Sequence, residues 1–335
     1  MGKIIGIDLG TANTLMCMKG RGIVLRCPSV VAISRSTREV VALGHNARNM
    51  LGKTPESILA VRPMKDGVIA DPDVIIKMLR IFFENADAIS FFSRPSVIAS
   101  LPHGVTEVEK RAIEDALFEA GARAVALIDE PIAAAIGSGL RIGSARGSMI
   151  VDIGGGTSEV AVISLGGISE TSSLRIAGNE LDEAIVAHLR RTRDVLFGLT
   201  DAENLKLRLG SAHPSADRGE MEVCGRNLRN SLAARITVSS AEIRQAITPH
   251  LDSIIRTIKS TLEQTAPELS SDIYDRGILL TGGGALLGGI DRLIEEKTGL
   301  RVTLAKAPLE SVCRGLLRII ESEEAMESLI HYRGR

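Results

Sequence analysis

The feature that most constrains the fold is a short pattern that occurs twice. Residues 4–11 read IIGIDLGT and residues 149–157 read MIVDIGGGT. In each copy an apolar run leads to an aspartate, one apolar residue, glycine and then threonine, after which apolar residues return. This pattern is typical of a β-hairpin whose turn carries a carboxylate, glycines and hydroxyl groups. Two copies in one chain predict a duplicated α/β unit.

Helical patterns fall between and after these two hairpins. The clearest spans residues 106–121, where Thr106 and Glu109 have the spacing of a capping box and Gly121 has that of a helix stop. At 335 residues the chain is too long for one ordinary core, so we expect two domains built alike. Further helices are predicted at 73–84, 180–197, 201–209, 240–263 and 286–297, and a buried strand at 278–281.

Composition excludes several classes of protein. A net charge of -1 argues against a protein that coats nucleic acid, and 2% aromatic residues without Trp argue against a base-stacking surface. The four cysteines form no CxxC pair, so no zinc site is expected. We expect no signal peptide before the first strand and no membrane span, which indicates a reduced, cytoplasmic protein.

The two aspartate-glycine turns have a shared chemical logic. Glycines let backbone N–H groups approach phosphate oxygens, and hydroxyls such as those of Thr11 and Thr157 add donors. Asp8 and Asp152 repel phosphate but suit Mg²⁺ held through its waters. Alternatively, each turn is only a tight turn, although that is less expected for two matched copies. A third glycine run, Gly282, Gly283 and Gly284, joins a strand to a helix, where it suits a sugar, a base or a phosphate.

Two further groups of charged residues stay open to two interpretations. Asp129 and Glu130 precede Pro131 at a strand-to-helix junction, which suits a residue that positions water or acts as a general base. They also suit a helix N-terminus through its dipole alone. Glu203 and Lys206 lie three positions apart on one helix face, where they would by themselves be an ordinary surface ion pair.

Taken together, these motifs resemble the actin/Hsp70/sugar-kinase ATPase superfamily, and within it the MreB family of bacterial actin homologues. The similar stretches extend over nearly the whole chain, and MKDGVIAD at 64–71 is specific to the MreB family. The others are DLGTANTL (8–15), GRGIVL (20–25), PSVVAI (28–33), MLGKTP (50–55), VRP (61–63), GSMIVDIGGGTSEVAVISL (147–165) and RGILLTGGGALL (276–287).

The resemblance implies an α/β, actin-like ATPase fold with two duplicated α/β lobes around a nucleotide cleft, each with a smaller subdomain. Lobe I would comprise residues 1–140 and 314–335, with its small subdomain at about 30–65. Lobe II would comprise residues 141–313, with its small subdomain at about 176–245.

It also implies roles for residues of this chain. Asp8 and Asp152 would organise Mg²⁺ and the attacking water, and Glu130 would position that water. Thr11, Ala12 and Asn13 would bind the phosphates of ATP from lobe I, and Gly154, Gly155, Gly156 and Thr157 from lobe II. Glu203 and Lys206 would reach the adenosine, and Gly282, Gly283 and Gly284 would line its base and ribose.

A loop sequence points to the membrane. Phe91 and Phe92 stand between serines and before Arg94 and Pro95, a pattern that predicts a loop tip with exposed aromatics, or else a loop that buries one of them. Proteins that resemble MreB commonly bind membrane through a loop at this position. The loop would act by avidity along a filament, since two Phe side chains give a monomer only about 3–5 kcal/mol.

The function implied is an ATP-hydrolysing protein that polymerises into filaments on the inner face of the cell membrane and organises cell shape and wall elongation. Its partners would be itself, the membrane, and membrane-anchored proteins of cell elongation and cell-wall synthesis. Two alternatives share the fold. A sugar-kinase-type phosphotransferase would show sugar-dependent ATP consumption, and a chaperone-type ATPase would carry a substrate-binding domain after residue 335.

Overall fold

The computed structural model describes residues 3–89, 93–330 and 332–334. The chain folds into two compact units. The first contains Met1–Ala145, Ile163–Ile168 and Leu309–Arg335, and the second contains Arg146–Val162 and Ser169–Pro308. Each unit is described by itself below.

A six-stranded sheet, in the order β19-β10-β9-β1-β2-β3, forms the centre of the first unit. Strands β1 (Ile4–Leu9) and β2 (Asn13–Met18) are antiparallel neighbours, with Asp8 opposite Leu15, so the first predicted hairpin is confirmed. Strand β1 is parallel to β9 (Ser96–Leu101), and β9 is parallel to β10 (Ala124–Asp129). The edge strands are β3 (Gly22–Pro28) and β19 (Arg333–Gly334). The carboxyl ends of β1, β9 and β10 therefore lie along the same edge of the sheet.

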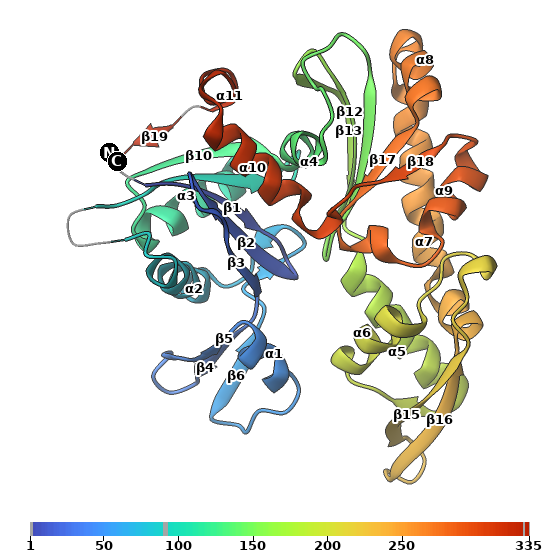
Figure 1. Ribbon diagram of the computed structural model, residues 1–335. Coiled ribbons are helices and arrows are strands. Elements are labelled where there is room, and N and C mark those ends of the chain that lie inside the picture. Colours follow the sequence, from blue (N-terminus) through green and yellow to red (C-terminus); the bar gives the residue numbers. More distant parts are fainter. Residues whose placement is uncertain (1–2, 90–92, 331, 335) are drawn as a thin grey trace. The chain divides into compact units, whose positions relative to one another are not determined.

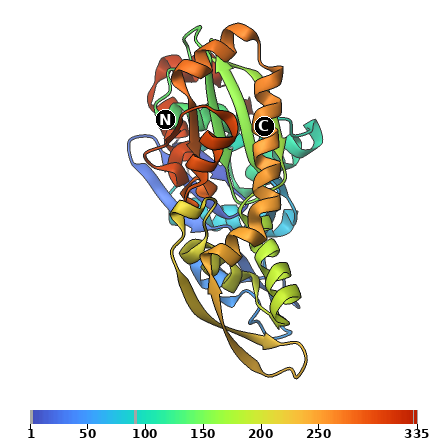
Figure 2. The same ribbon diagram turned by 90° about the vertical axis from the view of Figure 1, so that its right-hand side faces the viewer.

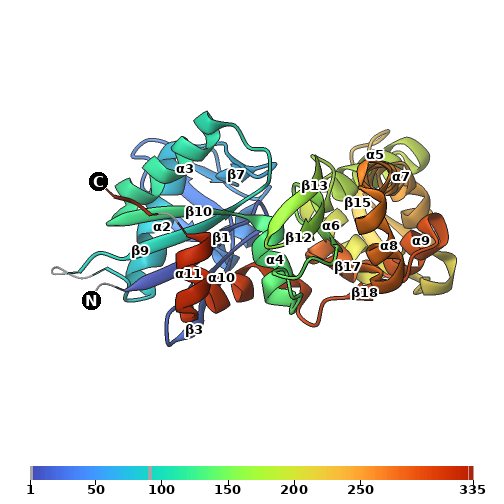
Figure 3. The same cartoon turned by 90° about the horizontal axis from the view of Figure 1, so that it is seen from above.

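Helices cover both faces of this sheet (Figures 1 and 3). Helices α2 (Pro72–Asn85) and α3 (Glu107–Ala120) form one core with the side chains of alternate strand residues such as Ile5 and Ile7. The capping box of Thr106 and Glu109 and the left-handed Gly121 at the end of α3 are confirmed. Helices α4 (Glu130–Ser138) and α10 (Ser311–Glu321) pack against each other, and α10 also contacts β1 and β2; α11 (Glu323–Leu329) follows α10.

Three glycines allow α10 to lie against its neighbours without intervening side chains. A Cβ at Gly315 would stand 1.8 Å from the carbonyl oxygen of Ala133, and a Cβ at Gly137 would stand 1.8 Å from that of Ser311. Helices α4 and α10 thus meet backbone to backbone. On the sheet side, a Cβ at Gly6 would stand 2.7 Å from Leu316 Cβ. Close packing at these points fixes the position of α10 over β1.

Smaller elements complete the first unit. Strands β5 (Val40–Leu43), β4 (Val31–Ser34) and β6 (Ile58–Val61) form a three-stranded sheet that packs with helix α1 (His45–Met50). Strands β7 (Met64–Lys65) and β8 (Val68–Ile69) form a hairpin. Its turn residues Asp66 and Gly67 both have positive φ angles, of 51° and 78°, which is the geometry of a type I′ turn and explains the Asp-Gly pair.

The second unit is built around a five-stranded sheet in the order β13-β12-β11-β17-β18. Its strands are β13 (Gly167–Leu174), β12 (Ser158–Ser164), β11 (Ser148–Ile153), β17 (Ile278–Thr281) and β18 (Val302–Leu304). Strand β17 is the buried strand predicted at 278–281, and it runs parallel to β11 with Thr281 beside Asp152. The core beside this sheet is formed by α5 (Gly178–Arg193), α6 (Leu199–Leu209), α7 (Ser240–Gln264), α8 (Pro267–Arg276) and α9 (Ile290–Thr298). Figure 2 shows the long α7 running along this unit.

A second small sheet, in the order β14-β15-β16, extends from the second unit. Strands β15 (Glu220–Asn227) and β16 (Ala233–Ser239) form the long hairpin seen at the bottom of Figure 2. The predicted helix at 180–197 is too long, because Val195–Leu196 forms strand β14. The helix ends at Arg193 because Asp194 adopts a left-handed conformation with φ of 52°.

The predicted helix at 286–297 also needs correction. Gly283–Leu286 forms a single 3-10 turn, and the α-helix begins only at Ile290, after Gly289 with φ of 73°. Two more short 3-10 turns occur at Pro214–Ala216 and Pro308–Glu310. Among the helices of the described residues, none is both long enough and apolar enough to cross a bilayer.

Candidate functional site

In the first unit, Asp8 stands at the carboxyl end of β1, where the chain turns through Gly10, Thr11 and Ala12 into Asn13 of β2. The turn is tight, since a Cβ at Gly10 would lie 2.5 Å from the carbonyl oxygen of Asn13. Ser29 braces it from the next connection, with its Oγ donating to the carbonyl oxygen of Gly10 at 2.6 Å. The Ser29 N–H also donates to the carbonyl oxygen of Ala12 at 2.9 Å. These two hydrogen bonds hold the backbone of the turn in place.

Thr11 connects this turn to the hairpin of β7 and β8. Its side chain is buried, and its Oγ1 accepts a hydrogen bond from the N–H of Gly67 at 3.1 Å. Gly67 belongs to the distinctive stretch MKDGVIAD at 64–71. One role of this stretch is therefore to hold the Thr11 hydroxyl of the first glycine turn in place.

The acid pair lies two strands away on the same sheet edge. Asp129 ends β10 beside Leu101 of β9, and Glu130 begins α4 with Pro131 in its first turn, as predicted. Both carboxylates are half-buried. The Oδ1 atom of Asp129 lies 2.9 Å from Nδ1 of His103, which follows β9. Asp8, Asp129 and Glu130 thus share the edge formed by the carboxyl ends of parallel strands, where ligands bind in α/β folds.

In the second unit, Asp152 takes the position that Asp8 takes in the first. It lies near the carboxyl end of β11, and its side chain is buried. Burial raises the pKa of Asp152 to about 7, because a carboxylate in an apolar setting loses its hydration. A Cβ at Gly282 would lie 2.2 Å from Asp152 Oδ1, so glycine is required for the TGGG turn to pass this carboxylate. Gly282 also has a positive φ of 82°.

The turn that follows Asp152 is held in place by its own backbone and by α5. The N–H of Gly154 donates to the carbonyl oxygen of Thr157 at 2.8 Å, which closes the second predicted hairpin turn. The N–H groups of Gly178 and Asn179, at the N-terminus of α5, donate to the carbonyl oxygens of Gly154 and Gly155. A Cβ at Gly178 would lie 3.3 Å from the carbonyl oxygen of Gly154, which is closer than most Cβ contacts.

Lys206 reaches the same place from α6. Its Nζ lies 2.8 Å from Oδ1 of Asp182 on α5 and donates to the carbonyl oxygen of Gly178 at 2.5 Å. The Lys206 side chain is only 14% exposed, so it is no ordinary surface lysine. Glu203, one turn earlier on α6, is half-buried. Within the second unit the structure therefore brings together Asp152, the glycine turn at 154–157, Lys206 and the TGGG turn.

Sequence reasoning missed three residues of these groups: Ser29, His103 and Asp182. None of them has a local signal, since each acts through a contact with a residue far along the chain. Phe91 and Phe92, the predicted membrane residues, lie outside the described residues.

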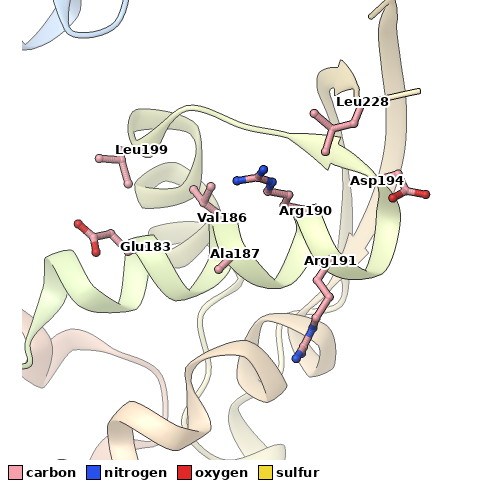
Figure 4. A pocket seen from close by; sticks show the side chains of 8 residues that line it. All are labelled: Glu183, Val186, Ala187, Arg190, Arg191, Asp194, Leu199 and Leu228. Carbon is pink, nitrogen blue, oxygen red and sulfur yellow. The ribbon is translucent and has the colours of Figure 1, made fainter. Parts of the chain in front are cut away.

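A surface groove of the second unit runs along α5 (Figure 4). Apolar side chains such as Val186, Leu199 and Leu228 line it, flanked by the charges of Arg190 and Asp194. None of the candidate phosphate-binding residues lies in its lining. The groove therefore does not mark the site described above.

Comparison with known proteins decides the family. The MreB/Mbl protein family model matches residues 2–328. The chain belongs to the MreB/Mbl family. It is 51% identical over 316 residues to the cell shape-determining protein MreB of Escherichia coli K12, covering 93% of this chain and 91% of that protein. It is 45% identical over 318 residues to the cell shape-determining protein Mbl of Bacillus cereus, covering 95% and 96%.

Solved structures of the MreB/Mbl family confirm the actin-like fold. MreB 5 of Spiroplasma citri bound to AMPPNP matches with a TM-score of 0.93 and 34% sequence identity, covering 98% of this chain and 97% of that one. The same protein bound to ADP matches with a TM-score of 0.92 and 34% identity, covering 98% of each chain. The MamK double helical filament, at 21% identity and a TM-score of 0.82 over 96% of this chain and 99% of that one, shares the fold.

Proposed function

We propose that this MreB/Mbl chain binds ATP with Mg²⁺, hydrolyses it, and assembles into filaments on the inner face of the cell membrane that organise cell shape and wall elongation. The observation that carries the proposal is the repeated geometry. Each unit presents an aspartate and a glycine-threonine turn at the carboxyl end of a sheet strand. The solved Spiroplasma relatives, bound to AMPPNP and to ADP, support a nucleotide as the ligand.

The phosphates of ATP would be bound by the backbone and hydroxyl groups of the two turns. These are Thr11, Ala12 and Asn13 in the first unit and Gly154, Gly155, Gly156 and Thr157 in the second. The supporting contacts of Ser29 and of Gly178 hold both turns before any ligand binds, which lowers the entropy that binding costs. Glu203 and Lys206 would reach the adenosine, and Gly282, Gly283 and Gly284 would lie along its base and ribose.

Each unit offers one carboxylate of the kind that suits a hydrated magnesium ion. Mg²⁺ keeps several waters and prefers oxygen ligands, and Asp8 and Asp152 offer carboxylates beside the two turns. When bound with ATP, the ion would neutralise charge on the phosphates. A nearby cation would also favour the ionised form of Asp152, against the effect of burial.

Glu130 is our candidate for the residue that holds the attacking water. It lies in the first turn of α4, directly after Asp129. Asp8 lies on the same edge of the sheet, near the carboxyl end of β1. A carboxylate can accept a hydrogen bond from water and so orient its lone pair. Pro131 and the close packing of α4 on α10 hold this helix end rigidly, which a positioning role requires.

Filament assembly and membrane attachment are proposed from the family. A filament requires a head-to-tail contact between copies that does not close into a ring. We propose that Phe91 and Phe92 insert into the lipid surface beside Arg94, and that many weak contacts along a filament add up. Membrane-anchored proteins of cell elongation and cell-wall synthesis would be the further partners. The protein would thus lie in the cytoplasm, peripheral to the membrane.

The test measures nucleotide binding and phosphate release together. The wild-type protein should bind ATP in the presence of Mg²⁺ and release phosphate slowly, without any added sugar. Glu130→Gln should keep nucleotide affinity within about twofold and reduce phosphate release by about 100-fold, the range expected for loss of a group that orients or deprotonates water. Sugar-dependent ATP consumption, or unchanged release by Glu130→Gln, would overturn the assignment.

A further inference from the structure

His103 and Asp129 form a contact that the roles proposed above leave unexplained. The imidazole Nδ1 lies 2.9 Å from Oδ1 of the carboxylate. The register of the sheet explains why they meet, because Leu101 at the end of β9 lies beside Asp129 at the end of β10. The loop after β9 carries His103 and then turns sharply at Gly104, whose φ is 82°. Residues far apart in the sequence are thus joined at the sheet edge.

The direction of the Asp129 side chain is unusual for its position. Asp129 is the N-cap residue of α4, and an aspartate there ordinarily accepts a hydrogen bond from a backbone N–H of the first turn. Its side chain makes no such capping bond. The carboxylate meets the imidazole instead, so His103 sets where this carboxylate points.

The charged groups around the pair come from three other elements. Helix α3 contributes Lys110, whose pKa is raised mainly by its hydrogen bond to Glu107 and also by the charge of Asp129. Helix α4 contributes Glu130, the next residue after Asp129. Strand β1 contributes Asp8 at the same sheet edge. Three carboxylates therefore gather along the edge, so the direction of each one affects its neighbours.

We propose that His103 is a positioning residue for ATP hydrolysis, which orients Asp129 and thereby holds the helix end that carries Glu130. The inference rests on the proposed function, in which Glu130 holds the attacking water. With His103 in place, the Asp129 carboxylate meets the imidazole and makes no capping bond to the first turn of α4. Without the imidazole, Asp129 would take the capping bond that is ordinary at its position. The first turn of α4, on which Glu130 stands, would shift with it.

The experiment compares wild type with His103→Gln and His103→Ala in single-turnover phosphate release at saturating ATP and Mg²⁺, and measures ATP affinity beside the rate. The glutamine amide can donate to Asp129, whereas alanine cannot. His103→Gln should keep the wild-type rate within about twofold. His103→Ala should be about tenfold slower with ATP affinity unchanged, because Asp129 loses its imidazole partner and Glu130 is displaced.

The controls separate this inference from the function on which it rests. His213→Ala removes the imidazole of another His-carboxylate pair, with Glu296 at 3.5 Å, and should keep the wild-type rate. In protein that already carries Asp129→Asn, His103→Ala should cause no further loss of rate. Equal rates for His103→Ala and His103→Gln, or for His103→Ala and wild type, would overturn the inference. If Glu130→Gln keeps the wild-type rate, the proposed function fails as well.

Discussion

The ammonium group of Lys206 on α6 lies 2.8 Å from a carboxylate oxygen of Asp182 on α5. Both side chains are nearly buried, at 14% and 8% exposed, and the lysine also holds the carbonyl oxygen of Gly178. One ion pair therefore joins two helices and fixes the helix end that supports the glycine turn after Asp152. It links the stability of the second unit to the geometry of its candidate phosphate site.

Removing this lysine should be costly. Lys206→Met should lower the free energy of unfolding by about 3–5 kcal/mol, because it removes the cation beside the buried carboxylate of Asp182. Lys297→Met is the matched control, since the exposed pair of Lys297 with Glu296 is worth at most about 1 kcal/mol. Urea unfolding of both variants measures the difference. Equal unfolding free energies for the two variants would contradict this account of the ion pair.

The contact between α4 and α10 makes a second prediction about stability. Gly315→Ala should destabilise the first unit by about 3 kcal/mol or prevent folding, because the new methyl group meets the carbonyl oxygen of Ala133 at 1.8 Å. Gly143→Ala introduces the same methyl group where no atom lies within 4 Å, so it should leave stability nearly unchanged. Thermal unfolding of the pair checks this, and a Gly315→Ala protein as stable as Gly143→Ala would show that the helices do not meet backbone to backbone.

Asp152 should give the protein without nucleotide a distinctive pH dependence. Burial raises its pKa from 3.8 in the unfolded chain to about 7. Because the pKa is higher in the folded state, binding of the proton favours folding. This contribution is complete below pH 3.8 and is lost, by about 1.4 kcal/mol per pH unit, as the pH rises from there through the folded pKa of about 7. Asp152→Asn lacks this titration. The variant should therefore be more stable than wild type at pH 8, with the difference shrinking as the pH falls to 5.

That difference is best followed by urea unfolding in a metal-free buffer, because Mg²⁺ with nucleotide would favour the ionised carboxylate. Subtracting the variant from wild type at each pH removes the contributions of other titrating groups, since both proteins share them. A difference that stays the same from pH 5 to pH 8 would show that Asp152 is charged throughout this range.

The membrane prediction concerns Phe91 and Phe92, which the sequence pattern predicts at a loop tip. Phe91→Ser with Phe92→Ser should reduce co-sedimentation with anionic vesicles severalfold, because two large apolar side chains no longer insert. Phosphate release should stay at the wild-type rate, since the change lies in no proposed catalytic or nucleotide-binding group. Phe82→Ser is unsuitable as a comparison because Phe82 is a core residue. Equal vesicle binding by the double variant and wild type would show that these two residues do not attach the protein to the membrane.

Local sequence patterns predicted the elements whose causes are local. The helix after Thr106 carries its own start and stop signals, and the structure has both. The strand before Gly282 is a short apolar run that ends in glycines, and the structure places it beside β11 as the sheet requires. The paired aspartate turns were found because each is encoded within about ten consecutive residues.

Contacts between distant residues could not be predicted in this way. The predicted helix at 180–197 is too long, because Asp194 adopts a left-handed conformation and β14 begins directly after it. A glycine at this position would have predicted the helix end, but the residue is an aspartate. By itself, the spacing of Lys206 and Glu203 indicates only a surface pair, since the sequence does not show that Asp182 lies beside the lysine. His103 meets Asp129 only because β9 and β10 are parallel neighbours. Such pairs depend on topology rather than on spacing.

The central claim is that ATP drives assembly at a membrane. The most direct measurement is electron microscopy of the purified protein on an anionic lipid monolayer with Mg²⁺ and ATP, beside the same sample with ADP. We predict filaments lying flat on the lipid with ATP, and fewer or none with ADP. A bare monolayer from protein that binds ATP normally in solution would contradict the account.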